Sequence, residues 1–361
     1  MSRLRVVVLF GGRSVEREVS RISARTIVGA LDPARYEVFP LAIAENGRFL
    51  TAEASAGLLT SGPAPAKYRL PEKTSPGDQA LVPSEMGPGR ADVVFPIIHG
   101  TTGEDGALQG FLELLDIPYV GAGVTASAIG MDKAVFKALL RDAGLPTPWA
   151  VVVTAAQVAK ARGRVEALGI RLPLFVKPSA GGSSVGVSKV KTWGALASAL
   201  DLALGYDERA LVEEGIDARE LECAVLGNSE PRASIVGEVV PGREFYDYED
   251  KYVEDRAKLL IPAPLPEAVA EEVRRLAVEA YRACAISGMA RVDFFLERPS
   301  NRVLVNELNT LPGFTAISMY PKLWEATGLP LGELLDELIR LALERHERRG
   351  RLRHEPPKEL R

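Results

Sequence analysis

The chain has 361 residues, 47% of them hydrophobic and 25% charged, which is enough for two or three globular domains. Its net charge of -4 argues against a nucleic-acid-binding protein, and no apolar run is long enough to span a membrane. Its two cysteines, Cys223 and Cys284, have no metal-binding or redox spacing, and the short apolar run near the start does not fit a signal peptide. We therefore expect a cytoplasmic protein without nucleic-acid or membrane partners.

The first apolar run, LRVVVLF at 4–10, predicts a strand that is buried on both faces of a parallel sheet. A glycine turn and a segment with helical spacing follow, so a helix N-terminus there would offer free N–H groups to an anion. Glu16 and Ser20 lie on the first turns of this helix, where helix capping and ligand binding both stay open. Residues 52–90 are rich in Pro, Gly, Ser and Ala and are predicted to form a long loop.

A second buried strand, ADVVFPIIHG, ends at His99 and is followed by the Gly-rich segment TTGEDG. An isolated histidine is usually a packing or capping residue. Here it stands at the carboxyl end of a strand, before a glycine loop, where ligand sites of α/β sheets form. We therefore treat His99 as a candidate site residue.

The segment 172–190, LPLFVKPSAGGSSVGVSKV, predicts two strands joined by a loop of Gly and Ser. Such a loop lets the backbone bend closely over a phosphate, and Lys177 adds a positive charge beside it. The segment is not a P-loop, because no GK[ST] opens a helix. A simple Gly-Ser hairpin turn remains the alternative. Further on, residues 243–266 lack periodicity and are predicted to form a lid, with Lys251 and Tyr252 as its candidate active side chains.

Residues 289–309 predict a hairpin, with the turn RPSNR between two strands rich in β-branched and aromatic residues. Because side chains alternate along a strand, Arg291 and Asp293 point together, and Glu307 and Asn309 point together on the partner strand. Two carboxylates and an amide, without histidine or thiolate, suit Mg²⁺ completed by phosphate oxygens and water. A solvated hairpin face is the alternative interpretation.

These pieces occur together in a known family. The chain resembles the ATP-grasp superfamily and, within it, the D-alanine–D-alanine ligase family. The matching segments come in order and cover nearly the whole chain: GGRSVEREVS at 11–20, HGTTGEDG at 99–106, MDK at 131–133, VKPSAGGSSVGVSKV at 176–190, EFYDYEDKY at 244–252, ARVDFF at 290–295 and NELNTLPGFTAISMYP at 306–321.

The resemblance implies a mixed α/β and α+β protein: an N-terminal Rossmann-like domain over 1–130, followed by a two-part ATP-grasp fold over 131–215 and 216–361. It implies a homodimer that acts in peptidoglycan precursor synthesis. ATP phosphorylates the carboxylate of one D-alanine, and the amine of a second D-alanine attacks the acyl phosphate. The implied cofactors are two Mg²⁺ ions per site, for which Mn²⁺ can substitute.

The resemblance also implies roles for individual residues. On the substrate side, the implied residues are Glu16, His99, Arg291, Gly313, Ser318 and Met319, with Ser183 and Tyr252 linking the lid to Glu16. For ATP they are Lys133, Lys177, Ser183, Ser184, Glu213, Glu214, Ile216, Glu220, Lys251, Asn306 and Glu307. The metal ligands implied are Asp293, Glu307 and Asn309.

Two positions depart from the family pattern, because Gly181 replaces an acidic residue and Glu214 a lysine of some relatives. A ligase that makes D-alanyl-D-lactate or D-alanyl-D-serine is the near alternative, and Tyr252 favours the dipeptide. Another ATP-grasp ligase would be expected to lack the first two motifs. A non-catalytic nucleotide-binding module would not need Arg291 beside three metal-binding oxygens.

Overall fold

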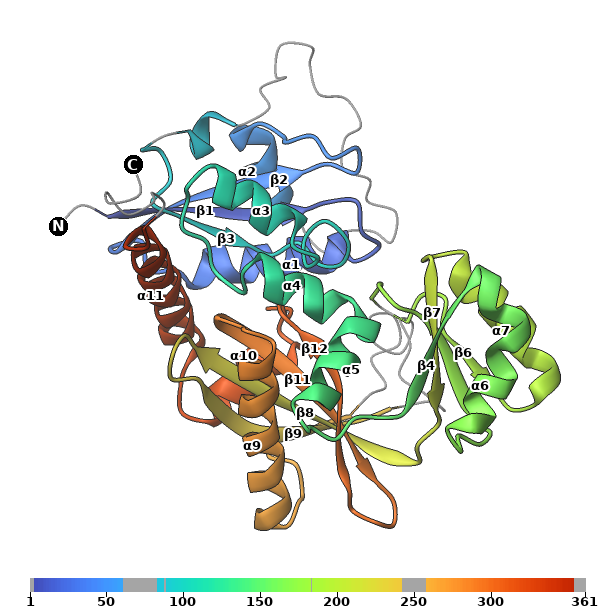
Figure 1. Ribbon diagram of the computed structural model, residues 1–361. Helices are drawn as coiled ribbons and strands as arrows, with labels where there is room; N and C mark the ends of the chain where they lie inside the picture. The colour runs from blue at the N-terminus through green and yellow to red at the C-terminus, as the bar shows by residue number, and fades with distance from the viewer. Residues whose placement is uncertain (1–2, 61–82, 88, 183, 242–257, 354–361) are drawn as a thin grey trace, which may run out of the picture.

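The structure is a computed structural model that describes residues 3–60, 83–87, 89–182, 184–241 and 258–353. In this described part, the strands form three separate sheets, and Figure 1 shows them in three units: one at the top, one at the lower left and one at the right. No helix among these residues has the length and apolar composition needed to cross a bilayer.

The first sheet is parallel, with strand order β2-β1-β3. The apolar run in β1 is fully buried from Val6 to Phe10, as expected for the middle strand of a sheet covered on both faces. Its helices pack against these strands. The elements are β1 (Leu4–Gly11), α1 (Arg17–Ala30), β2 (Tyr36–Ile43), α2 (Ala52–Thr60), η1 (Ser84–Met86), β3 (Val93–Pro96) and α3 (Ala107–Leu114).

One prediction for this region was wrong. Residues 52–60, expected to belong to a long loop, form helix α2, which buries Ser55, Leu58 and Leu59 against the sheet. The many small and polar residues of this segment made its helical spacing hard to recognise, and packing of the segment against the sheet stabilises the helix. The rest of the expected loop, 61–82, lies outside the described residues.

The central sheet is antiparallel, with order β4-β7-β5-β6. One face packs on α6 and α7 through a core that includes Val153, Val176, Leu200 and Val212. The opposite face therefore carries the alternate residues of the same strands, among them Lys177. The elements are β4 (Ala150–Thr154), η2 (Ala155–Lys160), α6 (Ala161–Ala167), β5 (Leu174–Pro178), β6 (Ser188–Val190), η3 (Trp193–Ala195), α7 (Leu196–Leu204) and β7 (Arg209–Glu214).

The third sheet has order β10-β9-β8-β11-β12, and every pairing in it is antiparallel. Helix α5 adds Phe136 and Leu140 to the core that this sheet shares with α9. The elements are α4 (Val124–Met131), α5 (Lys133–Asp142), β8 (Ala218–Gly227), β9 (Arg232–Val240), β10 (Lys258–Leu260), α9 (Glu267–Ala283), β11 (Gly288–Glu297), β12 (Val303–Asn309), α10 (Met319–Ala326) and α11 (Leu331–Gly350).

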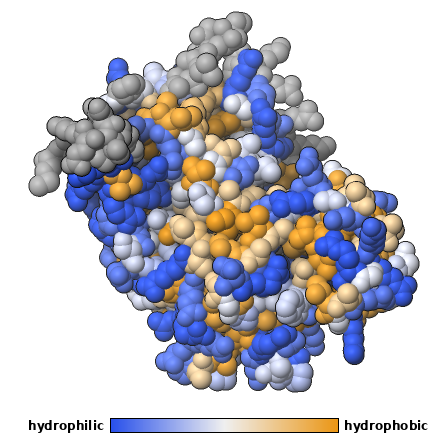
Figure 2. Space-filling model, viewed as in Figure 1, coloured by the Kyte–Doolittle hydropathy of each residue, from blue (hydrophilic) through white to orange (hydrophobic). Residues whose placement is uncertain are grey.

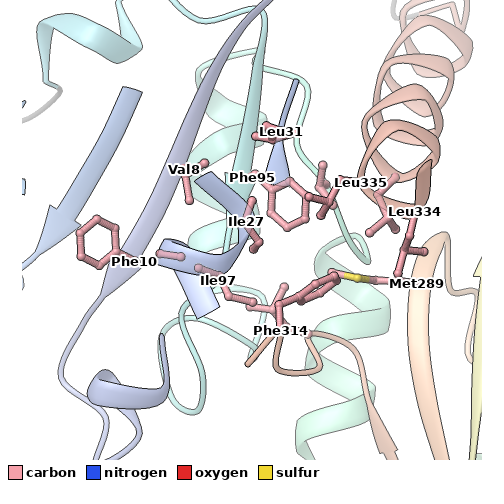
Figure 3. Close-up of a cluster of buried hydrophobic side chains, with 14 of the residues drawn as sticks. Val8, Phe10, Ile27, Leu31, Phe95, Ile97, Met289, Phe314, Leu334 and Leu335 are labelled. Carbon is pink, nitrogen blue, oxygen red and sulfur yellow. The ribbon is translucent and has the colours of Figure 1, made fainter. Parts of the chain in front are cut away.

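A continuous apolar cluster joins the first and third units (Figure 3). Phe314, from the loop after β12, meets Phe95 of β3 edge-on with 5.9 Å between ring centroids. Leu334 and Leu335 of α11 and Met289 of β11 complete the same cluster. Because buried side chains pack closely, this cluster fixes the loop after β12 against the carboxyl end of the first sheet. Figure 2 shows the outer face of this arrangement, where hydrophilic side chains surround apolar ones that gather near its middle.

Candidate active site

A pocket opens where the three units meet, and it draws its walls from the end of the first sheet, the glycine loop after β5 and the β11–β12 hairpin. Because these segments are far apart in sequence, only the folded chain brings them together. Ten of the predicted site residues line this pocket: Glu16, His99, Lys133, Arg291, Asp293, Glu307, Asn309, Gly313, Ser318 and Met319.

The hairpin forms as predicted and places its polar residues opposite one another. In the antiparallel register, Arg291 faces Asn309 and Asp293 faces Glu307, and a bulge follows at Asp293 and Phe294. Arg291 donates from Nε and Nη2 to the two oxygens of Asp293, each at 2.7 Å. Its Nε also lies 3.0 Å from Oε2 of Glu222 on the neighbouring strand β8. One arginine therefore balances two carboxylates at the floor of the pocket.

The donor atoms of this floor fit a hard cation. Asp293, Glu307 and Asn309 supply carboxylate and amide oxygens from adjacent strands, which is the donor type of Mg²⁺. Among the described residues, no group of three or more His, Cys, Asp and Glu side chains is arranged to hold a metal without other ligands. A bound ion would therefore need phosphate oxygens or water to complete its coordination, as Mg²⁺ does in nucleotide sites.

Lys133 connects the glycine loop to the hairpin. Asp132 caps helix α5 and accepts hydrogen bonds from the backbone N–H groups of Ala134 and Val135. The cap fixes the start of the helix, so that Lys133 projects from its first turn. Lys133 Nζ donates to the Gly181 carbonyl at 2.6 Å and lies 3.2 Å from Oε1 of Glu307. One ammonium thus stands beside both the loop and a candidate metal ligand.

His99 forms the opposite wall with Glu104. His99 Nδ1 lies 3.3 Å from Oε1 of Glu104 and 3.1 Å from the Leu311 carbonyl, so this nitrogen donates. Burial opposes the imidazolium charge, but the bond to Glu104 and the negative charges of Glu104 and Glu16 outweigh it and raise the pKa of His99. Burial is also the main reason that the pKa of Glu104 is raised. The pair therefore holds a proton beside the pocket.

The loop after β12 closes the pocket. Ser318 precedes α10, and its Oγ accepts the Thr315 N–H at 2.9 Å. A side chain at Gly313 would place its Cβ 2.8 Å from that Oγ, so it would displace the Ser318 hydroxyl from this position. The Phe314 N–H donates to Ser23 Oγ of α1 at 3.1 Å, which ties the loop to the first unit.

Other predicted residues lie elsewhere. In the described part of the chain, seven do not line this pocket: Lys177, Ser184, Glu213, Glu214, Ile216, Glu220 and Asn306. Three others, Ser183, Lys251 and Tyr252, lie outside the described residues. The sequence-based site set missed Glu104 and Glu222, which do line the pocket. Both could have been found from the sequence. Glu104 lies within the HGTTGEDG motif, and Glu222 lies on the same strand face as the predicted residue Glu220.

The fold and the pocket together define a class of protein. A Rossmann-like unit precedes two α+β units, and the pocket between them presents Lys133, a glycine loop and hard oxygen donors. This is the arrangement of the ATP-grasp enzymes, which use ATP.

Comparisons with known proteins identify the family. The family described as "D-ala D-ala ligase N-terminus" matches residues 5–122, and "D-ala D-ala ligase C-terminus" matches residues 139–340. The D-alanine–D-alanine ligase of Thermoanaerobacter sp. (strain X514) is 47% identical over 366 residues, which cover 97% of this chain and 99% of that protein. The chain therefore belongs to the D-alanine–D-alanine ligase family.

Solved structures agree with this assignment. The structure of the D-alanine–D-alanine ligase from Coxiella burnetii superposes with a TM-score of 0.83 at 39% identity, over 97% of each chain. The VanG D-Ala:D-Ser ligase from Enterococcus faecalis superposes with a TM-score of 0.79 at 32% identity, over 94% of this chain and 100% of that one. The fold thus accommodates relatives that differ in the second substrate.

Proposed function

We propose that this protein joins two D-alanines into D-alanyl-D-alanine at the expense of ATP, for peptidoglycan precursor synthesis. The observation that carries the proposal is the shared pocket. Glu16 and His99 of the first unit face Arg291, Asp293 and Glu307 of the third unit across one space. A site that activates a carboxylate with ATP needs both sets, because the amino acid and the phosphates must meet there.

The first step transfers a phosphoryl group. A carboxylate oxygen of the first D-alanine attacks the γ-phosphorus of ATP, and ADP leaves, which converts an unreactive carboxylate into an acyl phosphate. This transfer depends on positioning and on charge neutralisation more than on covalent chemistry by the protein. Glu16 would hold the ammonium of the first D-alanine, with His99 near it. Lys133 and Lys177 would neutralise phosphate charge.

The second step forms the peptide bond. The amine of the second D-alanine attacks the acyl carbon, phosphate leaves, and the amine loses a proton. Arg291 and the backbone N–H at Gly313 would stabilise the oxyanion of the tetrahedral intermediate. Ser318 and Met319 would receive the carboxylate of the second D-alanine. Ser183 and Tyr252 would link the lid to Glu16.

We propose two Mg²⁺ ions as the metal cofactors, held by Asp293, Glu307 and Asn309, with Mn²⁺ as a substitute. Bound there, they would supply positive charge to the phosphates. Glu213 and Ile216 would contact adenine. The other residues proposed for the nucleotide are Ser183, Ser184, Glu214, Glu220, Lys251 and Asn306.

Three further proposals rest on the family resemblance: domain boundaries near residues 130 and 215, a homodimer, and a cytoplasmic location. Sedimentation equilibrium of the purified chain tests the dimer. A monomer across the concentration range used for kinetics would contradict it.

The test of the reaction is phosphate release from ATP and Mg²⁺ with D-alanine, L-alanine, or D-alanine plus D-lactate or D-serine, with the product identified by mass. We expect D-alanyl-D-alanine from D-alanine and no turnover with L-alanine. The second candidate is a D-alanyl-D-serine or D-alanyl-D-lactate ligase, favoured by the likeness to the D-Ala:D-Ser ligase. D-alanyl-D-serine or D-alanyl-D-lactate as the main product would support this second candidate. No turnover with any of these substrates would exclude both candidates.

A further inference from the structure

Lys137 is a buried lysine that none of the roles above uses. It lies one turn after Lys133 on α5, and its side chain is 1% exposed. Its neighbours Phe136 and Leu140 pack into the core of the third sheet. Its own ammonium points elsewhere: Nζ lies 2.7 Å from Oε2 of Glu213 on β7 of the central sheet, and it donates to Thr147 Oγ1 at 3.1 Å. Lys137 thus connects helix α5, which packs on the core of the third sheet, with strand β7 of the central sheet.

Glu213 receives a second lysine at its other oxygen. Lys177 Nζ lies 2.7 Å from Oε1 of Glu213, and the Glu213 side chain is 3% exposed. Burial opposes ionisation of Glu213, but the charges of Lys137 and Lys177 outweigh it and lower the pKa of its carboxyl group. Burial also lowers the pKa of Lys137 to about 8, although Glu213 counteracts the shift. Removing one member of such a group leaves the others imperfectly compensated.

The charges of this cluster do not cancel, and the excess positive charge is closer to the solvent on one side. Two ammonium groups and one carboxylate leave one net positive charge in a region from which water is largely excluded. Lys137 is almost completely buried, whereas Lys177 is 13% exposed, so the excess charge acts outward mainly through Lys177. If Lys137 were neutral, Lys177 would form a one-to-one pair with Glu213 and the cluster would carry no net charge.

We propose that Lys137 is a positioning residue of the nucleotide site: it compensates Glu213 from behind, so that the positive charge of Lys177 stays available to the ATP phosphates. The inference rests on the proposed function only in placing ATP beside Lys177. It adds a residue with which the nucleotide itself makes no contact.

The experiment measures binding of Mg·ADP to the full chain by titration calorimetry, without any amino acid. Lys137→Met should weaken binding roughly ten- to a hundredfold, the range for losing one interaction with a charged group. In steady-state assays, the KM for ATP should rise while the KM for D-alanine changes by less than about twofold. Lys160→Met, on an exposed lysine of η2, removes the same charge elsewhere and should bind as the wild type does.

A second variant distinguishes charge compensation from a structural tether. Lys137→Met/Glu213→Gln removes both charges and restores the net positive charge on Lys177, so affinity for Mg·ADP should recover most of what Lys137→Met loses. Any remaining difference from the wild type is the adenine contact proposed for Glu213. A purely structural role predicts no recovery, because the link between α5 and β7 stays broken. Wild-type affinity in Lys137→Met, or no recovery in the double variant, would overturn the proposal.

If Lys137→Met does not fold, a comparison of two double variants still tests the proposal. Lys177→Met/Glu213→Gln keeps Lys137 in place of Lys177 and should bind Mg·ADP much more weakly than Lys137→Met/Glu213→Gln. Equal affinities would overturn the proposal. If the wild type binds Mg·ADP but joins no D-alanine, the proposed reaction fails while this inference stands on the calorimetry. If the wild type binds no Mg·ADP, both fail.

Discussion

The proposed nucleotide site has two clusters of charged residues, one on the hairpin and one on the central sheet, and they differ in burial. At the hairpin, Glu307 is 40% exposed and pairs with Lys133, whereas Glu213 in the central sheet is 3% exposed between two lysines. Exposed charges can exchange partners with an incoming ion at little cost, since water already solvates them. Buried charges cannot, because each needs a fixed partner. The hairpin is therefore suited to bind ligands. The cluster around Glu213 is suited to set the electrostatic potential at the site where they bind.

The largest effect should come from the hairpin. Glu307→Gln keeps the shape of the side chain but removes the charge that would hold the metal, so kcat for phosphate release should fall about a hundred- to a thousandfold. The measurement is phosphate release at saturating ATP and D-alanine. Glu297→Gln is the matched control, because Glu297 lies on the same hairpin and pairs with Arg302 away from the pocket. A kcat within twofold of the wild type would remove Glu307 from the reaction.

The hairpin was also the part of the site that the sequence predicted best. Alternation along 289–309 placed Arg291, Asp293, Glu307 and Asn309 together, and the observed register pairs them across two strands. That prediction needs only local information, since a strand repeats every two residues and the turn 298–302 fixes the pairing. The substrate and the role of each residue came from family resemblance and not from spacing.

The buried cluster shows why the rest was not predictable. Residues 137, 177 and 213 lie on a helix and two strands that are distant in sequence, and no local pattern links them. Lys137 stands beside apolar positions of an amphipathic helix, where a lysine reads as part of the solvated face. Helix α2 was missed for a related reason, because its packing partners lie in other elements. Contacts between distant segments determined both.

A moderate effect should come from the His99–Glu104 pair, which lines another part of the pocket. Glu104→Gln removes the charge that offsets burial of the imidazole, so the pKa of His99 should fall from above its ordinary value of 6.5 toward or below it. Nuclear magnetic resonance titration of the imidazole signals measures this directly. The KM for D-alanine should rise roughly fivefold, the equivalent of one ordinary hydrogen bond.

Glu113→Gln serves as the control for that pair, since Glu113 binds Arg349 and Tyr119 and does not line the pocket. It should leave both the His99 titration and the KM for D-alanine unchanged. An unchanged pKa of His99 in Glu104→Gln would show that Glu104 does not control the proton at this wall.

The smallest effect tests whether burial or pairing alone gives a charge its importance. Arg275 and Glu279 form an ion pair at 2.8 Å on α9, one helical turn apart, with side chains 57% and 40% exposed. Its distance matches that of Lys137 and Glu213, but water screens it, so Arg275→Ala should change the free energy of unfolding by no more than about 0.5 kcal/mol. Urea denaturation followed by circular dichroism measures this. A loss of unfolding free energy several times larger than this would mean that proximity, and not burial, determines the strength of such a pair.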